Sequence, residues 1–157
     1  MNTSIKWSLA LLFSVASFIC QANLKVDDPQ VRLLPPGVPN TAAYMQLTNT
    51  GNKVIRLIKA SSSASAKVEF HQSYHLDGMA KMKQVDELVI KQGQTLSLES
   101  GGTHIMLINL AQPLKQGEKV ALTLVDDNNQ IYKVMATVKK GHGGHHHGHH
   151  GHHQHHH

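Results

Sequence analysis

Short stretches in which apolar and polar residues alternate run through most of the chain and limit what it can fold into. Each stretch ends at turn-forming residues, such as Asn49 to Asn52 or Asp126 to Asn129, and no longer window shows a helical stripe. The alternating stretches cover residues 44–48, 54–58, 67–70, 95–98, 105–108, 120–124 and 131–134. Short strands at intervals of about ten residues are typical of sandwiches and barrels, so we predict one all-β domain over residues 23–140.

The first 22 residues read as a secretory signal peptide. Lys6 supplies the positive charge, residues 9–19 form a short apolar segment, and Ala22 provides a small residue for cleavage. A membrane anchor is disfavoured because the apolar run is short for a bilayer. Lipid attachment at Cys20 is disfavoured because Ile19 stands where a small residue is expected. We therefore expect an exported, periplasmic protein without a stable membrane anchor after cleavage.

Cys20 is the only cysteine, and it falls within the predicted signal peptide. Its removal leaves no thiol for a disulfide, a thiolate zinc site or a cysteine nucleophile. The chain also lacks the nucleophile-elbow, phosphate-loop and zinc-protease motifs. The net charge of +5 is spread along the chain without an arginine-rich stripe, which argues against nucleic acid. We expect neither an enzyme nor a nucleic-acid partner.

Residues 141–157 contain only glycine, histidine and one glutamine. Such a segment has no apolar residue to bury, so we expect it to be disordered without a ligand. An affinity tag would explain the composition, but Gly148, Gly151 and Gln154 interrupt the histidine runs. The functional interpretation is a flexible tail that binds Cu(II), with Zn(II) or Ni(II) as other candidates. Its candidate ligands are His142, His145, His146, His147, His149, His150, His152, His153, His155, His156 and His157.

A second group of potential ligands lies inside the predicted domain. His104 and Met106 are two residues apart and would share one face of a strand. For this pair alone, core packing of Met106 is the favoured explanation, because methionine commonly fills protein cores. His71 and Met82 add a second imidazole and a second thioether. Thioethers select Cu(I), and the absence of a thiolate argues against a blue-copper electron carrier.

The intervals between these residues match a known pattern. His71 is followed by ten residues, then Met82, then twenty-one residues, then His104-Ile105-Met106. In this spacing the chain resembles the periplasmic copper chaperone family PCu(A)C. The resemblance covers residues 23–140 and includes flanking segments such as Asp77-Gly78-Met79 and, further along, Pro113-Leu114-Lys115-Gln116-Gly117.

The resemblance implies a cupredoxin-like Greek-key β-sandwich with Cu(I) at an exposed site. It carries over His71, Met82, His104 and Met106 as the four ligands. Met79 is expected to line the site, and His75 to be a surface histidine with at most an accessory role with the metal.

The expected function is that of a monomeric periplasmic copper chaperone. The family implies delivery of Cu(I) toward the copper centre of cytochrome c oxidase, directly or through a thiol-containing copper chaperone. The tail would capture Cu(II) or buffer excess metal. The alternative is a periplasmic buffer or store for zinc, nickel or copper, in which the β domain is only a scaffold.

Overall fold

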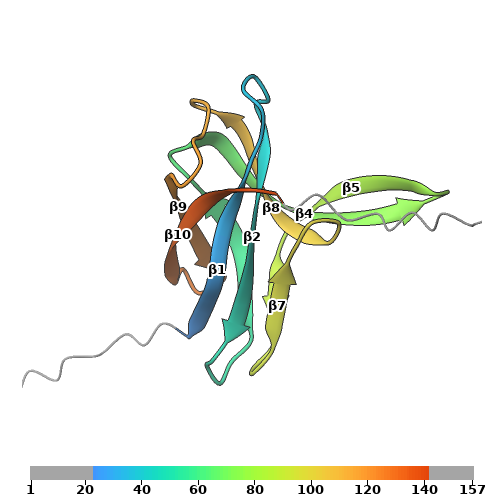
Figure 1. The fold of residues 1–157 in the computed structure, drawn as a ribbon. Coiled ribbons are helices and arrows are strands. Elements are labelled where there is room, and N and C mark those ends of the chain that lie inside the picture. Colours follow the sequence, from blue (N-terminus) through green and yellow to red (C-terminus); the bar gives the residue numbers. More distant parts are fainter. Residues whose placement is uncertain (1–22, 142–157) are drawn as a thin grey trace, which may run out of the picture.

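The structure is a computed structural model that describes residues 23–141 (Figure 1). The predicted signal peptide and the eleven tail histidines lie outside the described residues. Ten strands make up the described part: β1 Leu24–Leu33, β2 Thr41–Asn49, β3 Ile55–Ser61, β4 Ser65–Leu76, β5 Met79–Val85, β6 Leu88–Ile90, β7 Thr95–Leu98, β8 Thr103–Leu110, β9 Lys119–Asp126 and β10 Ile131–Lys140. The prediction of an all-β fold is confirmed. A search of the same residues for a helix of membrane-spanning length and apolarity finds none.

One continuous sheet contains all ten strands, in the order β5-β4-β8-β2-β1-β10-β9-β3-β6, with β7 paired to β2. β3 and β4 follow each other in sequence but stand near opposite ends of this order. They nevertheless contact each other, so the sheet folds back and encloses a core between its two halves. The crossing connections between non-neighbouring strands give the Greek-key arrangement of a β-sandwich.

The core is built from the inward-facing residue of every second position. On β2, Ala43, Met45 and Leu47 are buried, and on β10, Val134 and Val138 alternate with exposed residues. The enclosed side chains are almost all aliphatic, with Phe70 and Tyr132 as the aromatic exceptions. A core of this kind explains how the domain can fold without disulfides.

Three strands were not predicted: β1, β5 and β6, the last of which has only three residues. β1 contains Asp27-Asp28-Pro29, which interrupts its alternation; the structure absorbs this segment as a bulge, with a register shift and a positive φ of 42° at Asp28. β5 is exposed at every position except Val85, so it carries no apolar face for a pattern to reveal.

β4 is longer than the strand beside it and forms a projecting hairpin with β5. Its pairing with β8 ends at Gln72 and Thr103, and from Ser73 onward β4 is paired only with β5. Figure 1 shows these two strands extending away from the body of the domain. We call residues 73–82 the ribbon. Its turn is formed by Asp77 and Gly78, with φ of 53° and 75°, the geometry of a tight two-residue hairpin loop.

A buried asparagine fixes the loop that follows β2. Asn49 is fully buried; its amide nitrogen donates to the carbonyls of Lys53 (2.7 Å) and Ile90 (2.9 Å), and its oxygen accepts from the Gly51 amide (3.0 Å). The amide nitrogen and the oxygen of this side chain are both paired with backbone groups, so loss of the side chain leaves those groups without their partner.

We predict that Asn49→Ala lowers the free energy of unfolding by about 2–4 kcal/mol, because one buried and two part-buried hydrogen bonds lose their partner. Urea denaturation measures the change. Asn52→Ala is the matched control, since Asn52 is exposed in the same loop, and it should stay within about 0.5 kcal/mol of the parent. Equal effects of the two substitutions would contradict this role of Asn49.

Candidate metal site

The register of three neighbouring strands places the four predicted ligands on one face. His71 on β4 is directly opposite His104 on β8, and Met106 is opposite Glu69. On the other side of β4, Met82 is opposite Ser73. Residues opposed across antiparallel strands, and residues two apart along a strand, share a face of the sheet. His71, Met82, His104 and Met106 therefore project from the same side.

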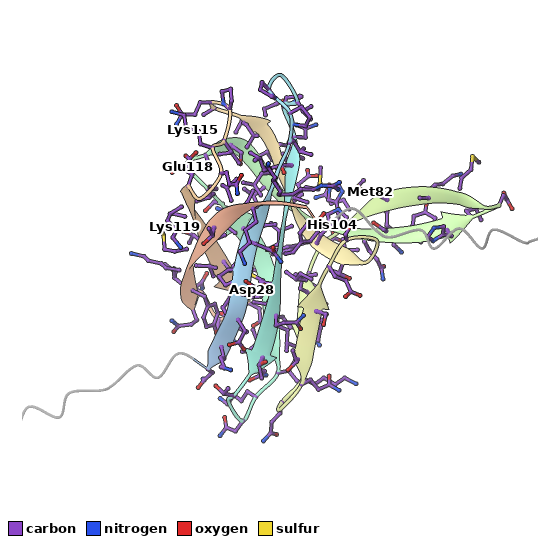
Figure 2. All side chains as sticks on the ribbon, viewed as in Figure 1. Asp28, Met82, His104, Lys115, Glu118 and Lys119 are labelled. Carbon is purple, nitrogen blue, oxygen red and sulfur yellow. The ribbon has the colours of Figure 1, made fainter. Side chains whose placement is uncertain are left out.

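This shared face is the outer side of the sheet. Ile105 and Leu107, which alternate with the candidate ligands on β8, are fully buried in the core. The face is nevertheless partly covered, because His104 is only 5% exposed and Met106 is half-buried. Figure 2 shows Met82 and His104 where the ribbon leaves the body of the domain.

The two imidazoles are close enough to share one ion. The ring centres of His71 and His104 are 5.9 Å apart, with 48° between their planes. A metal bound at about 2 Å from a ring nitrogen lies roughly 3 Å from the ring centre, so two rings on one ion have centres at most about 6 Å apart. The observed separation lies within that limit.

Hydrogen bonds determine which nitrogen of His71 is available. Its Nε2 is 2.7 Å from Glu69 Oε2, and the ionised carboxylate can only accept, so Nε2–H is the donor. Nδ1 then carries the lone pair. It is buried and has no hydrogen-bond partner. A buried ring nitrogen without a partner is uncommon in a folded protein, and it is the group that a metal would satisfy.

His104 is oriented in a similar way by the backbone. Its Nδ1 donates to the carbonyl oxygen of Gly102 at 3.0 Å, which leaves Nε2 as the unprotonated nitrogen. The same carbonyl accepts the backbone amide of Ser73 at 3.0 Å, so it joins the base of the ribbon to the turn before β8. Tyr44 packs beside His104, with ring centres 6.4 Å apart. Both histidines are thus held by partners of the kind that orient metal ligands.

The thioethers complete the donor set. Within residues 23–141, no three or more His, Cys, Asp and Glu side chains are grouped so as to hold a metal ion. A site on this face therefore depends on the sulfurs of Met82 and Met106. Met82 is 54% exposed, in contrast to the buried His104, so the face is open toward the ribbon.

Glu69 is the residue that the sequence interpretation missed. Lys67 forms an ion pair with Oε1, and His71 binds Oε2. The hydrogen bond from Lys67 lowers the pKa of Glu69 most, and the one from His71 lowers it further, although burial acts in the opposite direction. The available signal was the alternation of Lys67, Glu69 and His71, which places all three on one face of β4.

Met79 and His75, which were expected to line the site or to be accessory to it, lie on different faces of the ribbon. Met79 is opposite Leu76 at the tip of the ribbon, on the face away from His71, so it does not line this site. His75 is opposite Ala80 and lies on the same face as His71 and Met82.

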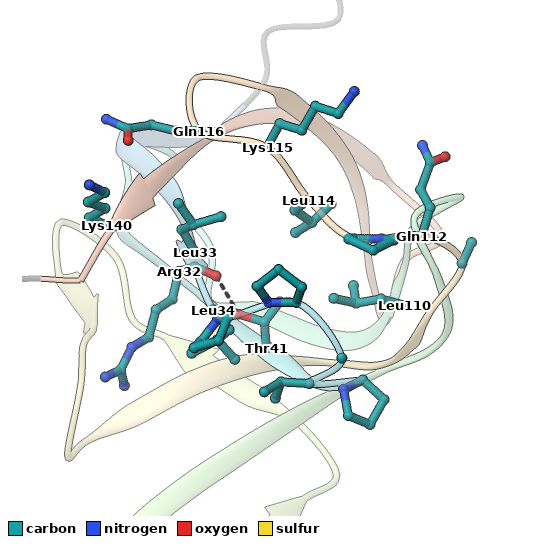
Figure 3. A pocket seen from close by; sticks show the side chains of 17 residues that line it. Arg32, Leu33, Leu34, Thr41, Leu110, Gln112, Leu114, Lys115, Gln116 and Lys140 are labelled. Carbon is teal, nitrogen blue, oxygen red and sulfur yellow. Dashed lines mark hydrogen bonds between the residues drawn. The ribbon is translucent and has the colours of Figure 1, made fainter.

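An apolar cavity lies elsewhere in the domain, and none of the four candidate ligands lines it. It has a volume of about 780 Å³ and is enclosed by the loops between β1 and β2 and between β8 and β9. Figure 3 shows its aliphatic lining, including Leu33, Leu110 and Leu114, and the 2.6 Å hydrogen bond from the Thr41 hydroxyl to the Arg32 carbonyl. Its apolar lining distinguishes it from the donor-rich face of β4 and β8.

Comparison with known proteins relates the chain to putative lipoproteins. The family model described as "Putative lipoprotein LpqE-like" matches residues 24–138. "Putative lipoprotein Lxx21020" of Leifsonia xyli subsp. xyli is 34% identical over 104 residues, which cover 66% of this chain; the chain spans 63% of that relative's length.

Solved structures show the same fold. The solution structure of Cu(I)-DR1885 from Deinococcus radiodurans is 40% identical, covers 73% of this chain and 76% of its own, and has a TM-score of 0.60. The copper-bound PCuAC domain from PmoF2 is 21% identical, covers 76% of this chain and 94% of its own, and has a TM-score of 0.63. The similarity to the PmoF2 domain shows the fold, and it confirms the expected PCuAC-type, cupredoxin-like architecture.

We predict that the carboxyl group of Glu69 titrates with a midpoint below its usual 4.5. Because the folded-state pKa is lowered, the ionised group stabilises the fold above its unfolded-state pKa, and this contribution is lost as the pH falls through the folded-state value. Side-chain carboxyl NMR measures the midpoint. Lys67→Ala should raise it, and an unchanged midpoint in that variant would contradict the assigned cause.

We also predict that His71 in the metal-free protein is the Nε2–H tautomer and His104 the Nδ1–H tautomer. Long-range ¹H–¹⁵N NMR of the imidazoles above pH 7.5 distinguishes the two forms. Glu69→Gln should reduce the tautomer preference of His71 and leave that of His104 unaltered, because Gly102 provides the partner of His104. A His71 that keeps the same tautomer in this variant would show that Glu69 does not set it.

Proposed function

The chain belongs to the LpqE-like family, and we propose that it is an exported PCu(A)C-type copper chaperone that binds Cu(I) through His71, Met82, His104 and Met106. The observation that carries the proposal is the pair of oriented imidazoles, 5.9 Å apart, on a face shared with two methionines. The relative DR1885, 40% identical, has been solved with Cu(I), which supports the same cargo here.

The donor chemistry favours Cu(I) over other ions. Two neutral imidazoles and two neutral thioethers form a soft set without a carboxylate or thiolate ligand, whereas zinc, calcium and magnesium sites normally use anionic or oxygen donors. Glu69 contacts His71 and not the sulfurs, so its role is to position the imidazole. It also stabilises positive charge that His71 gains when it shares electrons with the ion.

The same geometry suits a carrier. His104 is held in the body of the domain and Met82 is exposed at its edge, so the ion can pass to an acceptor on the side of Met82. Thioethers bind less tightly than thiolates, which keeps the ion exchangeable. Transfer then proceeds by ligand exchange, with copper as Cu(I) throughout.

The acceptor and the compartment follow from the resemblance to PCu(A)C proteins. We infer delivery toward the cytochrome c oxidase copper centre, directly or through a thiol-containing copper chaperone, by a monomer in the periplasm. The relative from Leifsonia is named as a lipoprotein, which supports export and makes Cys20 worth examining for a lipid. Mass spectrometry of the mature chain separates cleavage after Ala22 from lipid attachment at Cys20.

The histidine tail is proposed to bind Cu(II), or Zn(II) and Ni(II), beside the Cu(I) site. Its root lies beside the outer face of the sheet. Lys139 of β10 is opposite Arg32 of β1, and the adjacent row of paired residues points into the core: Val138, Val31, Ala43 and Ile105. Three strand spacings separate Lys139 from Met106, about 14 Å along the sheet. The sixteen residues that follow Gly141 are long enough to cross that distance.

We predict that Met82→Ala with Met106→Ala weakens Cu(I) binding by roughly 100-fold or more, since loss of even an outer-shell partner typically costs about 10–100-fold. Competition against a chromophoric Cu(I) chelator measures the affinity. Met135→Ala is the matched control, because Met135 is also 54% exposed but lies on β10. Unaltered affinity in the double variant would refute the ligand assignment.

We further predict that truncation after Gly141 removes the additional Cu(II) equivalents and leaves the single Cu(I) site intact. Tail binding should also weaken as the pH falls from about 7 to 5, because imidazoles with pKa values near 6.5 become protonated. Calorimetric titration of both chains with each ion measures this. Loss of all Cu(I) binding on truncation would instead favour a tail-based buffer for zinc, nickel or copper.

A further inference from the structure

The ribbon carries a second histidine at the same geometric relation to Met82 as His71. Met82 is directly opposite Ser73, and His71 and His75 are the residues two positions before and after Ser73. Both histidines are therefore diagonal neighbours of Met82 on one face. Diagonal neighbours lie about 7–8 Å apart at their backbones, within reach of long side chains.

Exposure along this face changes in one direction. The side chain of His71 is 16% exposed and His104 is 5% exposed, whereas Met82 is 54% exposed and His75 is also exposed. An ion that leaves the His71–His104 pair toward solvent therefore passes Met82 first. His75 is the next nitrogen donor along that route.

The side chain of His75 is free to act as a ligand. Within residues 23–141 it has no hydrogen bond or ion pair, in contrast to His71 with Glu69 and His104 with Gly102. Its opposite neighbour is Ala80, which leaves space above the ribbon. A histidine fixed by no partner can turn toward an ion on Met82 without breaking another interaction.

We propose that His75 and Met82 form an outer station for Cu(I), which receives the ion from the inner site and presents it to the acceptor. This proposal rests on the proposed function. In the step, the bonds from copper to His71 Nδ1, His104 Nε2 and the Met106 sulfur break, a bond from a His75 ring nitrogen forms, and the bond from the Met82 sulfur persists. No electron or proton is transferred. Met82 is the shared ligand, and His75 is an exchange ligand that the inner site does not need for equilibrium binding.

The test compares transfer rates in the full chain loaded with one equivalent of Cu(I). Stopped-flow absorbance follows the ion onto bicinchoninic acid, and competition titration gives the equilibrium affinity of the same samples. We expect His75→Ala to slow transfer roughly tenfold, a rise of about 1.4 kcal/mol in the barrier, with little change in affinity. The tail is present in all chains, so its contribution is common to them.

Two further variants test whether the face on which the histidine lies matters, or only the presence of an additional histidine. Ala80→His in the His75→Ala background restores an imidazole to the same face, directly opposite the original position, and should recover much of the rate. Tyr74→His in the same background moves the imidazole by one residue to the opposite face of the ribbon and should not.

The outcomes distinguish this proposal from the proposed function. A wild-type chain that binds no Cu(I) would overturn both. Normal Cu(I) affinity with transfer unchanged in His75→Ala would overturn the outer station alone. Equal rescue by the Ala80 and Tyr74 variants would also overturn it, since the effect would then depend on an additional histidine and not on its face. Rescue by the Ala80 variant alone supports it.

Discussion

The pairing of β4 between β8 and β5 is the constraint on which the site depends. It sets His71 directly opposite His104 and brings Met82 and Met106 to the same side. Side chains alternate between faces, so a slip of one residue on β4 would turn His71 into the core and Phe70 out of it. Burial of Phe70, Ile105 and Leu107 opposes that slip. Packing on the inner face thus maintains ligand geometry on the outer face.

The outer face combines a rigid part with an accessible part. Strands paired on both sides hold the two histidines, and Glu69 and Gly102 orient them. Met82 stands where β4 has lost β8 as a neighbour and only β5 continues. A carrier needs both properties, since a fully enclosed ion could not be handed on and a fully exposed one would be poorly selected.

The sequence predicted the all-β class because half-buried strands alternate visibly, as in β2 and β10. It missed β5, whose two faces are both exposed, β1, where Asp27-Asp28-Pro29 forms a bulge, and β6, which has only three residues. The spacing along the sequence identified the four candidate ligands, but spacing does not show which atoms are in contact. The role of Glu69 depends on which nitrogen of His71 it contacts, and the sequence does not determine that nitrogen by any visible pattern.

The two-residue turn at Asp77 and Gly78 explains why ten residues separate His71 and Met82. In a hairpin closed by two residues, positions that share a face across the strands differ by an odd number. Met82 is eleven positions after His71 and satisfies this parity rule, whereas Met79 is eight positions after it and does not. The length of the turn therefore decides which methionine of the Met-x-x-Met segment can face the histidines. One residue inserted into the turn would exchange the positions that share a face with His71 without altering any donor.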